Sequence, residues 1–281
     1  MIGLLAGYGL FPIVFAKKCR HMGIRLACTG IRGEASGELA QLADHFQWAG
    51  PAQLGKIIRF FKANHISEVI MAGKIHKANI MHKPWKIFTL LPDLRTIRFW
   101  FSRNRKDNKD DSILLGIVNE FQRDGIHIGS ALDYCPEILV REGTLSKRSP
   151  SSLEWEDIRF GWRLAREMGR LDVGQSVAVK SKAVLAVEAI EGTDLNIQRA
   201  GEFCRAGGFV VVKVAKPNQD RRFDVPTVGS STIRGLHAAG GKVLAVEAGQ
   251  TIILEEEETI QLANQLGITL ISLTDSHIQA A

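Results

Sequence analysis

The sequence predicts an α/β protein of two domains, the first of which contains a parallel sheet. Residues 1–6 are continuously apolar, as expected for a parallel strand that is buried on both faces. A helix at 11–22 and a strand at 25–29 follow, and a helix at 54–64 leads to a strand at Glu68–Ala72. Strands that alternate with helices along a chain are typical of parallel sheets with crossover helices.

The second half of the chain begins after a break in this pattern. An amphipathic helix at 112–123 is followed by glycines and prolines over 125–155, where Ser149-Pro150-Ser151-Ser152 reads as a linker. We therefore expect one domain at 1–130 and a second α/β domain at 131–281. Its pattern predicts helices at 155–168, 196–206 and 255–266. It also predicts strands at 176–180, 183–189, 209–214 and 269–273, and a strand pair at 242–246 and 251–254.

Composition indicates a cytoplasmic protein. Of the 281 residues, 45% are hydrophobic and 23% are charged, the mix of a soluble globular protein. The four cysteines include no C-x-x-C pair, so we expect them to be reduced and mostly buried. No secretory signal and no bilayer-length apolar run is found. The protein is expected to be soluble, or to sit on the cytoplasmic face of the inner membrane without crossing it.

A basic, aromatic segment lies between Lys83 and Lys109. It holds eight Lys/Arg and two Asp, so that its net charge equals the +6 of the whole chain, and Trp85, Phe99 and Trp100 lie among these charges. Such a segment suits the surface of an anionic membrane. The alternative is an ordinary helix that faces a core and has a solvated basic side. Nucleic acid is not expected to be a partner, because no groove-reading motif accompanies the patch.

The first strand ends in a short glycine loop, Gly7-Tyr8-Gly9-Leu10, before a helix. Glycine lets a backbone approach a phosphate, and a helix N-terminus favours an anion, although a tight structural turn would look the same. A third glycine and an acidic residue after the second strand are both missing, which disfavours NAD binding. Gly73-Lys74 ends the third strand at the same sheet edge, where a lysine can meet a phosphate.

Two acidic groups admit both a structural and a functional interpretation. Asp110-Asp111 precedes the helix at 112–123, where carboxylates cap free amides, and a metal or sugar-hydroxyl role is the alternative. An apolar strand ends in Glu191-Gly192-Thr193-Asp194, which is either a ligand loop or a helix-capping turn.

The richest candidate site is the loop between Lys213 and Gly229. It carries Lys213, Lys216, Gln219, Asp220, Arg222 and Asp224. Cations can neutralise a pyrophosphate, and a carboxylate among them can hold a divalent ion or orient a water. A solvated, self-paired charge cluster is the alternative. No P-loop, G-x-S-x-G elbow or H-E-x-x-H motif is present, and the histidines are scattered, which disfavours a binuclear metallophosphoesterase.

At these residues the sequence resembles the LpxI-type UDP-2,3-diacylglucosamine pyrophosphatases of lipid A biosynthesis, over nearly the whole chain. The resemblance is carried by Gly7-Tyr8-Gly9 with Pro12, Ala72-Gly73-Lys74, Asp110-Asp111, residues 169–175, residues 184–194, and Pro217-x-Gln219-x-x-Arg222-x-Asp224-x-Pro226-Thr227-Val228-Gly229. Tyr8, at a position that is often smaller in the family, and the basic aromatic segment are departures from the family pattern.

The resemblance implies a Rossmann-like N-terminal domain, a distinct C-terminal domain, and substrate held between the two halves. It also implies magnesium-assisted hydrolysis to UMP and 2,3-diacylglucosamine 1-phosphate. The essential aspartate of the family corresponds to Asp224, with Asp220 as a second metal candidate. Magnesium could be replaced by another divalent cation.

These observations combine into one hypothesis with two alternatives. Asp224 would ligate the metal or activate water, and Lys213, Lys216 and Arg222 would neutralise the diphosphate. The predicted nucleotide and sugar contacts are Gly7, Tyr8, Gly9, Leu10, Gly73, Lys74, Glu191, Gly192, Thr193, Asp194 and Gln219. A non-catalytic nucleotide-lipid carrier and a nucleotide-sugar oxidoreductase are the alternatives, and a homodimer is compatible with the sequence.

Overall fold

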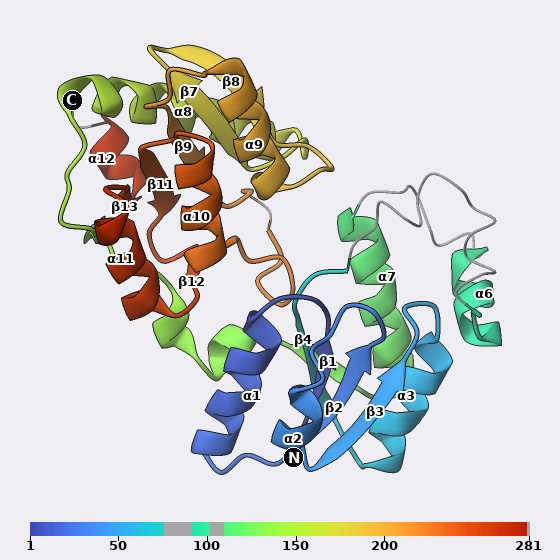
Figure 1. The fold of residues 1–281 in the computed structure, drawn as a ribbon. Helices are drawn as coiled ribbons and strands as arrows, with labels where there is room; N and C mark the ends of the chain where they lie inside the picture. Colours follow the sequence, from blue (N-terminus) through green and yellow to red (C-terminus); the bar gives the residue numbers. More distant parts are fainter. Residues whose placement is uncertain (76–90, 102–109, 218, 280–281) are drawn as a thin grey trace. The chain divides into compact units, whose positions relative to one another are not determined.

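The computed structural model describes residues 1–75, 91–101, 110–217 and 219–279. Its Cα positions form two compact units (Figure 1). Unit 1 comprises Met1–Pro136 together with the short segment Asp220–Phe223, and unit 2 comprises Glu137–Gln219 and Asp224–Ala281. Both units contain a sheet with flanking helices, so the predicted α/β class is confirmed.

Unit 1 is built on a five-stranded parallel sheet in the order β3-β2-β1-β4-β5. Its strands are β1 (Ile2–Ala6), β2 (Leu26–Ile31), β3 (His45–Ala49), β4 (Glu68–Ala72) and β5 (His127–Gly129). The order 3-2-1-4-5 is that of a Rossmann-like sheet, in which the ligand edge is formed by the carboxyl ends of the strands. All five strands therefore deliver their following loops to one edge.

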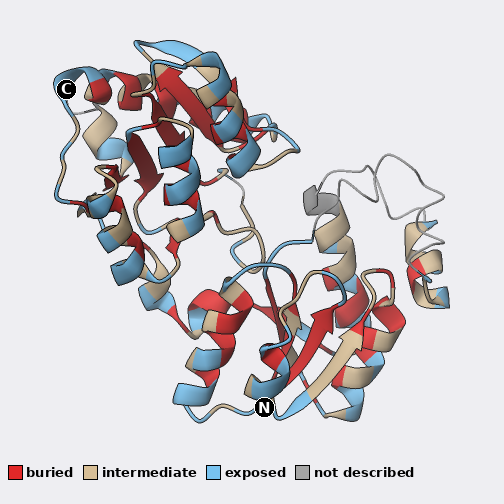
Figure 2. Ribbon diagram, viewed as in Figure 1, coloured by how far each residue is buried: buried red, intermediate tan, exposed pale blue. Residues whose placement is uncertain are grey.

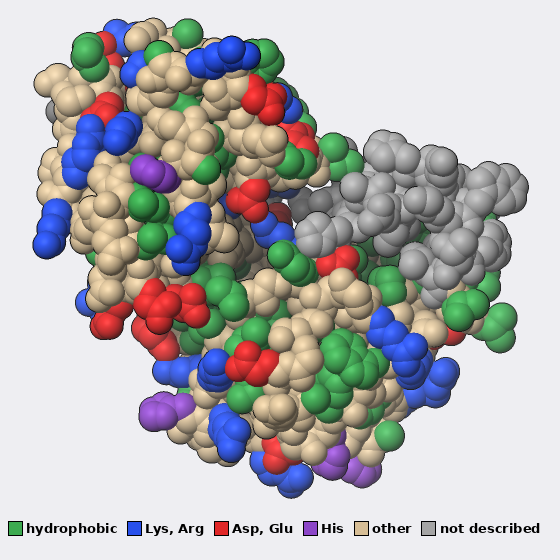
Figure 3. Space-filling model, in the orientation of Figure 1, with side chains coloured by type: hydrophobic (Ala, Val, Ile, Leu, Met, Phe, Trp, Pro, Cys, Tyr) green, Lys and Arg blue, Asp and Glu red, His purple; other side chains and the backbone are tan. Residues whose placement is uncertain are grey.

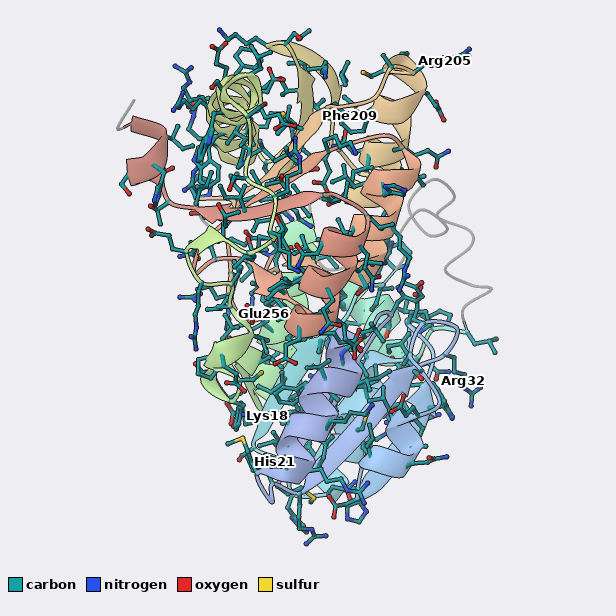
Figure 4. The ribbon with its side chains drawn as sticks, turned by 60° about the vertical axis from the view of Figure 1, so that its left-hand side comes forward. Lys18, His21, Arg32, Arg205, Phe209 and Glu256 are labelled. Atoms are coloured by element: carbon teal, nitrogen blue, oxygen red, sulfur yellow. The ribbon has the colours of Figure 1, made fainter. Side chains whose placement is uncertain are left out.

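Helices cover both faces of this sheet. One face carries α1 (Phe11–His21), whose Lys18 and His21 lie in the last turn and complement the helix dipole (Figure 4), and the short α2 (Leu39–Leu42) packs on α1. The other face carries α3 (Leu54–Ala63) and α7 (Asp110–Arg123), whose buried side chains share a core with β2, β4 and β5. Helix α6 (Leu94–Trp100) packs on α3.

Unit 2 is built on a mixed six-stranded sheet in the order β6-β13-β11-β9-β7-β8. Its strands are β6 (Gly143–Thr144), β7 (Ser176–Lys180), β8 (Ala183–Val187), β9 (Val210–Lys213), β11 (Val243–Glu247) and β13 (Thr269–Leu273). β9, β11 and β13 are parallel, whereas β7 runs antiparallel to both β9 and β8. Nearly all residues of β7, β9, β11 and β13 are buried (Figure 2), which explains why most of them are apolar.

Two hydrophobic layers enclose the unit 2 sheet. α8 (Ser152–Arg170) covers one face, where Gly161 lets the helix approach Val179 and Val212 closely. The other face is covered by α9 (Thr193–Phe203), α10 (Ser230–Ala238) and α11 (Glu256–Gln265). Acidic side chains gather at the start of α11 (Figure 3), where they complement the helix dipole.

Several predicted boundaries need correction. The stretch Ser149–Ser152 is not a linker, because Ser151 caps α8 in a capping box with Glu154. α7 begins at Asp110, so that Asp110 and Asp111 belong to the helix instead of preceding it. The strand predicted at 251–254 is β12 (Ile252–Ile253), and it pairs with β10 (Thr227–Val228) and not with the strand at 242–246.

The cysteines agree with the prediction from composition. All four are free, and Cys19, Cys28 and Cys135 are buried. Burial raises the pKa of the Cys28 thiol to about 12 and that of Cys19 to about 11, so both stay protonated at neutral pH. Among the described residues, no helix combines the length and apolar character needed to cross a bilayer.

Candidate functional site

In unit 1, the glycine loop after β1 and the turn after β4 are joined to each other. The amide of Tyr8 donates to the Lys74 carbonyl at 2.7 Å, and the amide of Lys74 donates to the Tyr8 carbonyl at 2.9 Å. A Cβ on Gly7 would lie 2.4 Å from the Lys74 oxygen, and one on Gly73, whose φ is +88°, would lie 2.7 Å from the Tyr8 oxygen. These two glycines are therefore needed for the close approach of the two loops.

Gly9 and Leu10 precede α1, and here glycine is needed for its backbone conformation and not for close packing. Gly9 has a φ of +106° and open space where a Cβ would be, so its backbone conformation alone calls for glycine. Leu10 is the N-cap of α1 and makes no side-chain capping bond, and the first turn holds no acidic residue. The amides at this end of α1 thus keep the partial positive charge that favours an anion.

A shallow hollow of about 350 Å³ lies at the carboxyl ends of β2 and β3 and is lined by Arg32, Gly33 and Trp48. Arg32 directly follows β2 (Figure 4). None of the predicted site residues lines this hollow, so it is a feature of the unit 1 ligand edge that the sequence did not indicate.

In unit 2, three segments meet at one edge of the sheet. β9 ends at Lys213 and β8 ends at Val187, while β7 begins at Ser176 and runs in the opposite direction. Ser176 pairs with Lys213, and Val177 pairs with Val187, so the loops at 171–175, 188–194 and 214–219 lie side by side. Arg205 and Phe209, which precede β9, mark the opposite end of the sheet (Figure 4).

A lysine lies between two carboxylates at this edge. The Nζ of Lys216 is 2.8 Å from Oδ1 of Asp172 and 3.9 Å from Oδ2 of Asp224. The side chains are partly shielded, with 17% of Lys216, 26% of Asp172 and 32% of Asp224 exposed. The predicted pair of Lys216 and Asp224 is thus brought together, and Asp172 joins it.

Other residues of the same loop have structural partners. Lys213 is only 3% exposed, and its Nζ donates to the Thr227 carbonyl at 3.0 Å, so in this conformation it supports the loop and does not present its charge at the surface. Gln219 accepts a bond from the Lys216 amide at 2.9 Å and donates to Gln175 at 3.3 Å. It therefore fixes the backbone that carries Lys216.

The 188–194 loop combines a helix start with a buried carboxylate. Gly192 is the N-cap of α9, with a φ of +85°, and Thr193 donates to Oε1 of Glu188 at 3.1 Å instead of capping the helix. Glu191 pairs with Arg199 at 2.7 Å, and Asp194 is exposed in the first turn. Glu188 is 7% exposed, and its Oε2 has no hydrogen-bond partner among the described residues.

Asp220 and Arg222 bind each other within unit 1. The Nε of Arg222 lies 2.9 Å and 3.1 Å from the two oxygens of Asp220, and a second guanidinium nitrogen donates as well. These bonds from Arg222 lower the pKa of the Asp220 carboxyl and raise that of the guanidinium. Both oxygens of Asp220 are thereby engaged, unlike the arrangement expected of a metal ligand.

The basic aromatic segment is described only over residues 91–101, and the rest of it, like the side chains of Asp110 and Asp111, lies outside the described part. Arg95 faces inward and binds Glu120 at 2.8 Å and also Asp124. Leu91, Leu94 and Phe101 are exposed, Leu94 to 86%. This part of the segment thus turns a charge towards the protein and large apolar side chains towards solvent.

The sequence had not singled out Asp172 and Glu188 as site residues. Both lie beside the predicted loops, and a Cβ on Gly174 would fall 2.0 Å from the Glu188 carbonyl oxygen, which shows how closely their segments pack. A signal existed for Asp172, because it directly follows a helix at a position where glycine is usual. No comparable signal distinguishes Glu188 from other strand-end acids.

The fold and these sites define an α/β protein with a Rossmann-like unit and a second unit whose sheet edge carries a partly shielded Asp-Lys-Asp cluster. Family models agree with this division: the LpxI N-terminal domain matches residues 1–138, and the LpxI C-terminal domain matches residues 141–271. The UDP-2,3-diacylglucosamine pyrophosphatase LpxI of Caulobacter vibrioides is 32% identical over 282 residues, which cover 97% of both chains. The chain belongs to the LpxI family.

Solved structures give only distant likenesses. The biotin carboxylase subunit of pyruvate carboxylase is 13% identical, with a TM-score of 0.27 over 73% of this chain and 42% of that one. The biotin carboxylase domain of 2-oxoglutarate carboxylase from Hydrogenobacter thermophilus is 12% identical, with a TM-score of 0.25 over 73% of this chain and 41% of that one. The chain thus spans less than half the length of these carboxylase chains, and the TM-scores are too low to establish a shared fold.

Proposed function

We propose that this protein hydrolyses the pyrophosphate of UDP-2,3-diacylglucosamine, giving UMP and 2,3-diacylglucosamine 1-phosphate for lipid A biosynthesis. One observation carries the proposal: this chain is 32% identical, over 97% of both chains, to a protein named for this activity. One water adds across the P–O–P bond, so that each product leaves with one phosphate.

The unit 2 sheet edge is the proposed place of hydrolysis. Asp224 is part of a loop with a fixed backbone and lies 3.9 Å from the ammonium of Lys216. A carboxylate near a cation stays ionised, which suits it to orient water or to hold a metal, and the ammonium can offset the charge that grows on the diphosphate. Lys74, the Gly7–Leu10 loop and the Glu191–Asp194 loop stay predicted contacts of the nucleotide and the sugar.

The carboxylates of this site fit magnesium if the substrate phosphates supply the other ligands. Mg²⁺ is usually bound through one or two carboxylates together with substrate phosphates. Asp224 would be the protein ligand, whereas Asp172 is bound by Lys216 and Asp220 would first have to release Arg222. Within the described part of the chain, no group of three or more His, Cys, Asp or Glu is gathered for a cage made of protein alone. When bound, the ion would neutralise phosphate charge.

Large apolar side chains surround the charged cluster, which supports an acylated substrate. Four such side chains are exposed near this end of the sheet: Leu171 and Val173 before β7, Ile190 after β8, and Leu195 in the first turn of α9. Isolated exposed apolar residues are common, but four on adjoining segments form a patch. The acyl chains of a sugar held at Lys216 and Asp224 would find apolar contacts there.

The decisive experiment uses purified protein with UDP-2,3-diacylglucosamine and Mg²⁺, and follows UMP by anion-exchange chromatography. We expect Asp224→Asn to lower kcat by about 10²-fold or more, as removal of a group that positions a reacting water does. Asp194→Asn, in the exposed first turn of α9, serves as the matched carboxylate variant with a smaller loss. Tight binding of the substrate without UMP release by the wild type would support the carrier alternative instead.

We further propose that the protein is cytoplasmic and touches the inner membrane. The apolar side chains exposed around α6 support this, together with the basic residues of the surrounding sequence. Sedimentation with anionic and neutral vesicles tests it: Leu94→Ser should weaken binding to anionic vesicles, while Leu153→Ser, equally exposed on α8, should not. A homodimer stays a prediction for analytical ultracentrifugation.

A further inference from the structure

The turn after α8 places Asp172 in a conformation that an aspartate rarely adopts. Asp172 has a φ of +57°, in the left-handed region. Its amide donates to the Gly169 carbonyl, and the Val173 amide donates to the Met168 carbonyl, both at 3.1 Å. These two bonds form a Schellman motif in which Asp172 occupies the position that glycine usually takes.

An aspartate at this position costs the fold stability that a glycine would not cost. Residues held in a sparsely populated backbone region point to a functional demand on their side chain. The carboxylate of Asp172 makes a contact that glycine could not make, because it binds the ammonium of Lys216 at 2.8 Å.

The backbone of Lys216 is held in place as well as its side chain. Its amide donates to Gln219, and Gln219 donates to Gln175, which belongs to the same turn as Asp172. A Cβ on Gly169 would lie 3.4 Å from the Lys216 Cα, so the turn and the Lys216 backbone are in contact. Backbone and side chain of Lys216 are therefore both held by residues 169–175.

The two carboxylates compete for one ammonium. The distance of 2.8 Å to Asp172 is that of a charge-assisted hydrogen bond, whereas 3.9 Å to Asp224 is beyond hydrogen-bond range. If Asp172 lost its charge, the ammonium would lose its nearer carboxylate and would still be attracted by Asp224, and the side chain of Lys216 is long enough to close the remaining gap.

We propose that Asp172 is a positioning residue, which keeps Lys216 from forming a direct ion pair with Asp224. The Lys216 ammonium thereby stays at the place from which it can meet the diphosphate and does not occupy a hydrogen-bonding position on the Asp224 carboxylate. This inference rests on the proposed function, because it assigns Asp172 a part in the same hydrolysis.

Asp172→Gly separates this role from a structural one. Glycine suits the left-handed position, so we expect a Tm equal to or above that of the wild type. We expect kcat to fall about tenfold, with KM changed less than about threefold, because substrate contacts remain while the Lys216 ammonium moves towards Asp224. Asp172→Asn, which tolerates the same backbone conformation, should behave alike. A merely structural residue would instead keep its kcat in the better-suited glycine variant.

Lys182→Gly is the matched control. Lys182 also has a positive φ, +59°, but lies in the β7–β8 turn at the other end of the sheet, so its variant should keep the wild-type kcat. In a Lys216→Met background, Asp172→Gly should cause no further loss of kcat, because the residue it positions is gone. Wild-type kcat in both Asp172 variants would overturn the inference.

A measurement that needs no substrate tests this inference separately from the proposed function. Absence of UMP release by the wild type would overturn the function. The contact itself is tested by the Tm values of Asp172→Asn, Lys216→Met and the double variant, which should be non-additive. Additive Tm changes would mean that Asp172 does not hold Lys216, whatever the reaction.

Discussion

Asp220 and Asp224 are four residues apart, yet their surroundings differ. Asp220 is bound on both oxygens by Arg222, while Asp224 has the ammonium of Lys216 at 3.9 Å. The sequence pattern indicated both as metal candidates because it shows charges without their pairing. It could not show that Arg222 engages its near neighbour, or that the Lys213 side chain is buried against the Thr227 carbonyl.

The Asp220–Arg222 pair predicts a specific dependence on pH. Because Arg222 lowers the pKa of Asp220 in the folded state, the pair stabilises the protein above the ordinary aspartate pKa of about 3.9 and loses this effect as pH falls through the lowered value. Since 26% of the Asp220 side chain stays exposed, solvent screens the pair, and the contribution should be no more than about 1 kcal/mol. The Tm values of wild type and Asp220→Asn should therefore differ at pH 7 and approach each other as the pH falls below the ordinary value of about 3.9.

Parallel Tm curves from pH 7 to pH 3 would contradict this account. They would mean that the effect of the substitution does not come from the charge of Asp220.

At the scale of elements, hydrophobic periodicity located the buried strands well. Glu68–Ala72, Ser176–Lys180 and Thr269–Leu273 are confirmed to the residue, and the strand predicted at 1–6 is β1 at Ile2–Ala6, because strands buried on both faces are mostly apolar. β3 escaped prediction because it is an edge strand that alternates polar His45 and Gln47 with Phe46 and Trp48. The site edge was only partly predictable, since strand order decides which loops become neighbours.

The helix α9 offers a prediction about the acylated substrate. Leu195, in its first turn, belongs to the apolar patch at the site edge, whereas Phe203, its last residue, lies eight residues further on, about 12 Å along the axis. Leu195→Ser should raise KM for UDP-2,3-diacylglucosamine several-fold, as expected when about 1 kcal/mol of apolar contact is lost. Phe203→Ser, at a position that is more exposed (71% against 53%), should leave KM unchanged. Steady-state kinetics on both variants decides, and equal KM values would remove the patch from the substrate site.

At the scale of the whole molecule, the chain does not divide at a single point. Unit 2 contributes the segment Asp220–Phe223 to unit 1, where Phe223 packs on the hydrophobic core of β4 and α7, and Ser130 donates to the Arg221 carbonyl at 2.9 Å. Glycines and prolines did indicate a division of the chain, but this short segment carries no compositional mark. Only tertiary packing assigns it to unit 1.

Phe223→Ala tests how much the segment Asp220–Phe223 contributes to the stability of unit 1. Loss of a partly buried phenylalanine should cost about 2 kcal/mol, less than in a full core, and lower the Tm of unit 1. Since Asp224 is the next residue, kcat should fall as well. Hydrogen exchange of β4 and α7 amides reports the first effect, and UMP release the second. Phe203→Ala, at an exposed position, is the control, and exchange rates equal to those of the wild type would contradict the prediction.

The divided makeup of unit 1 restricts how relatives can exchange parts by recombination. A crossover after Pro136 would join one parent's 1–136 to the other parent's 137–281, and the segment around Phe223 would then come from the wrong parent. A chimera would have to transplant those four residues together with the N-terminal portion. Residues 220–223 should therefore vary in step with β4 and α7, although they are encoded far downstream of both.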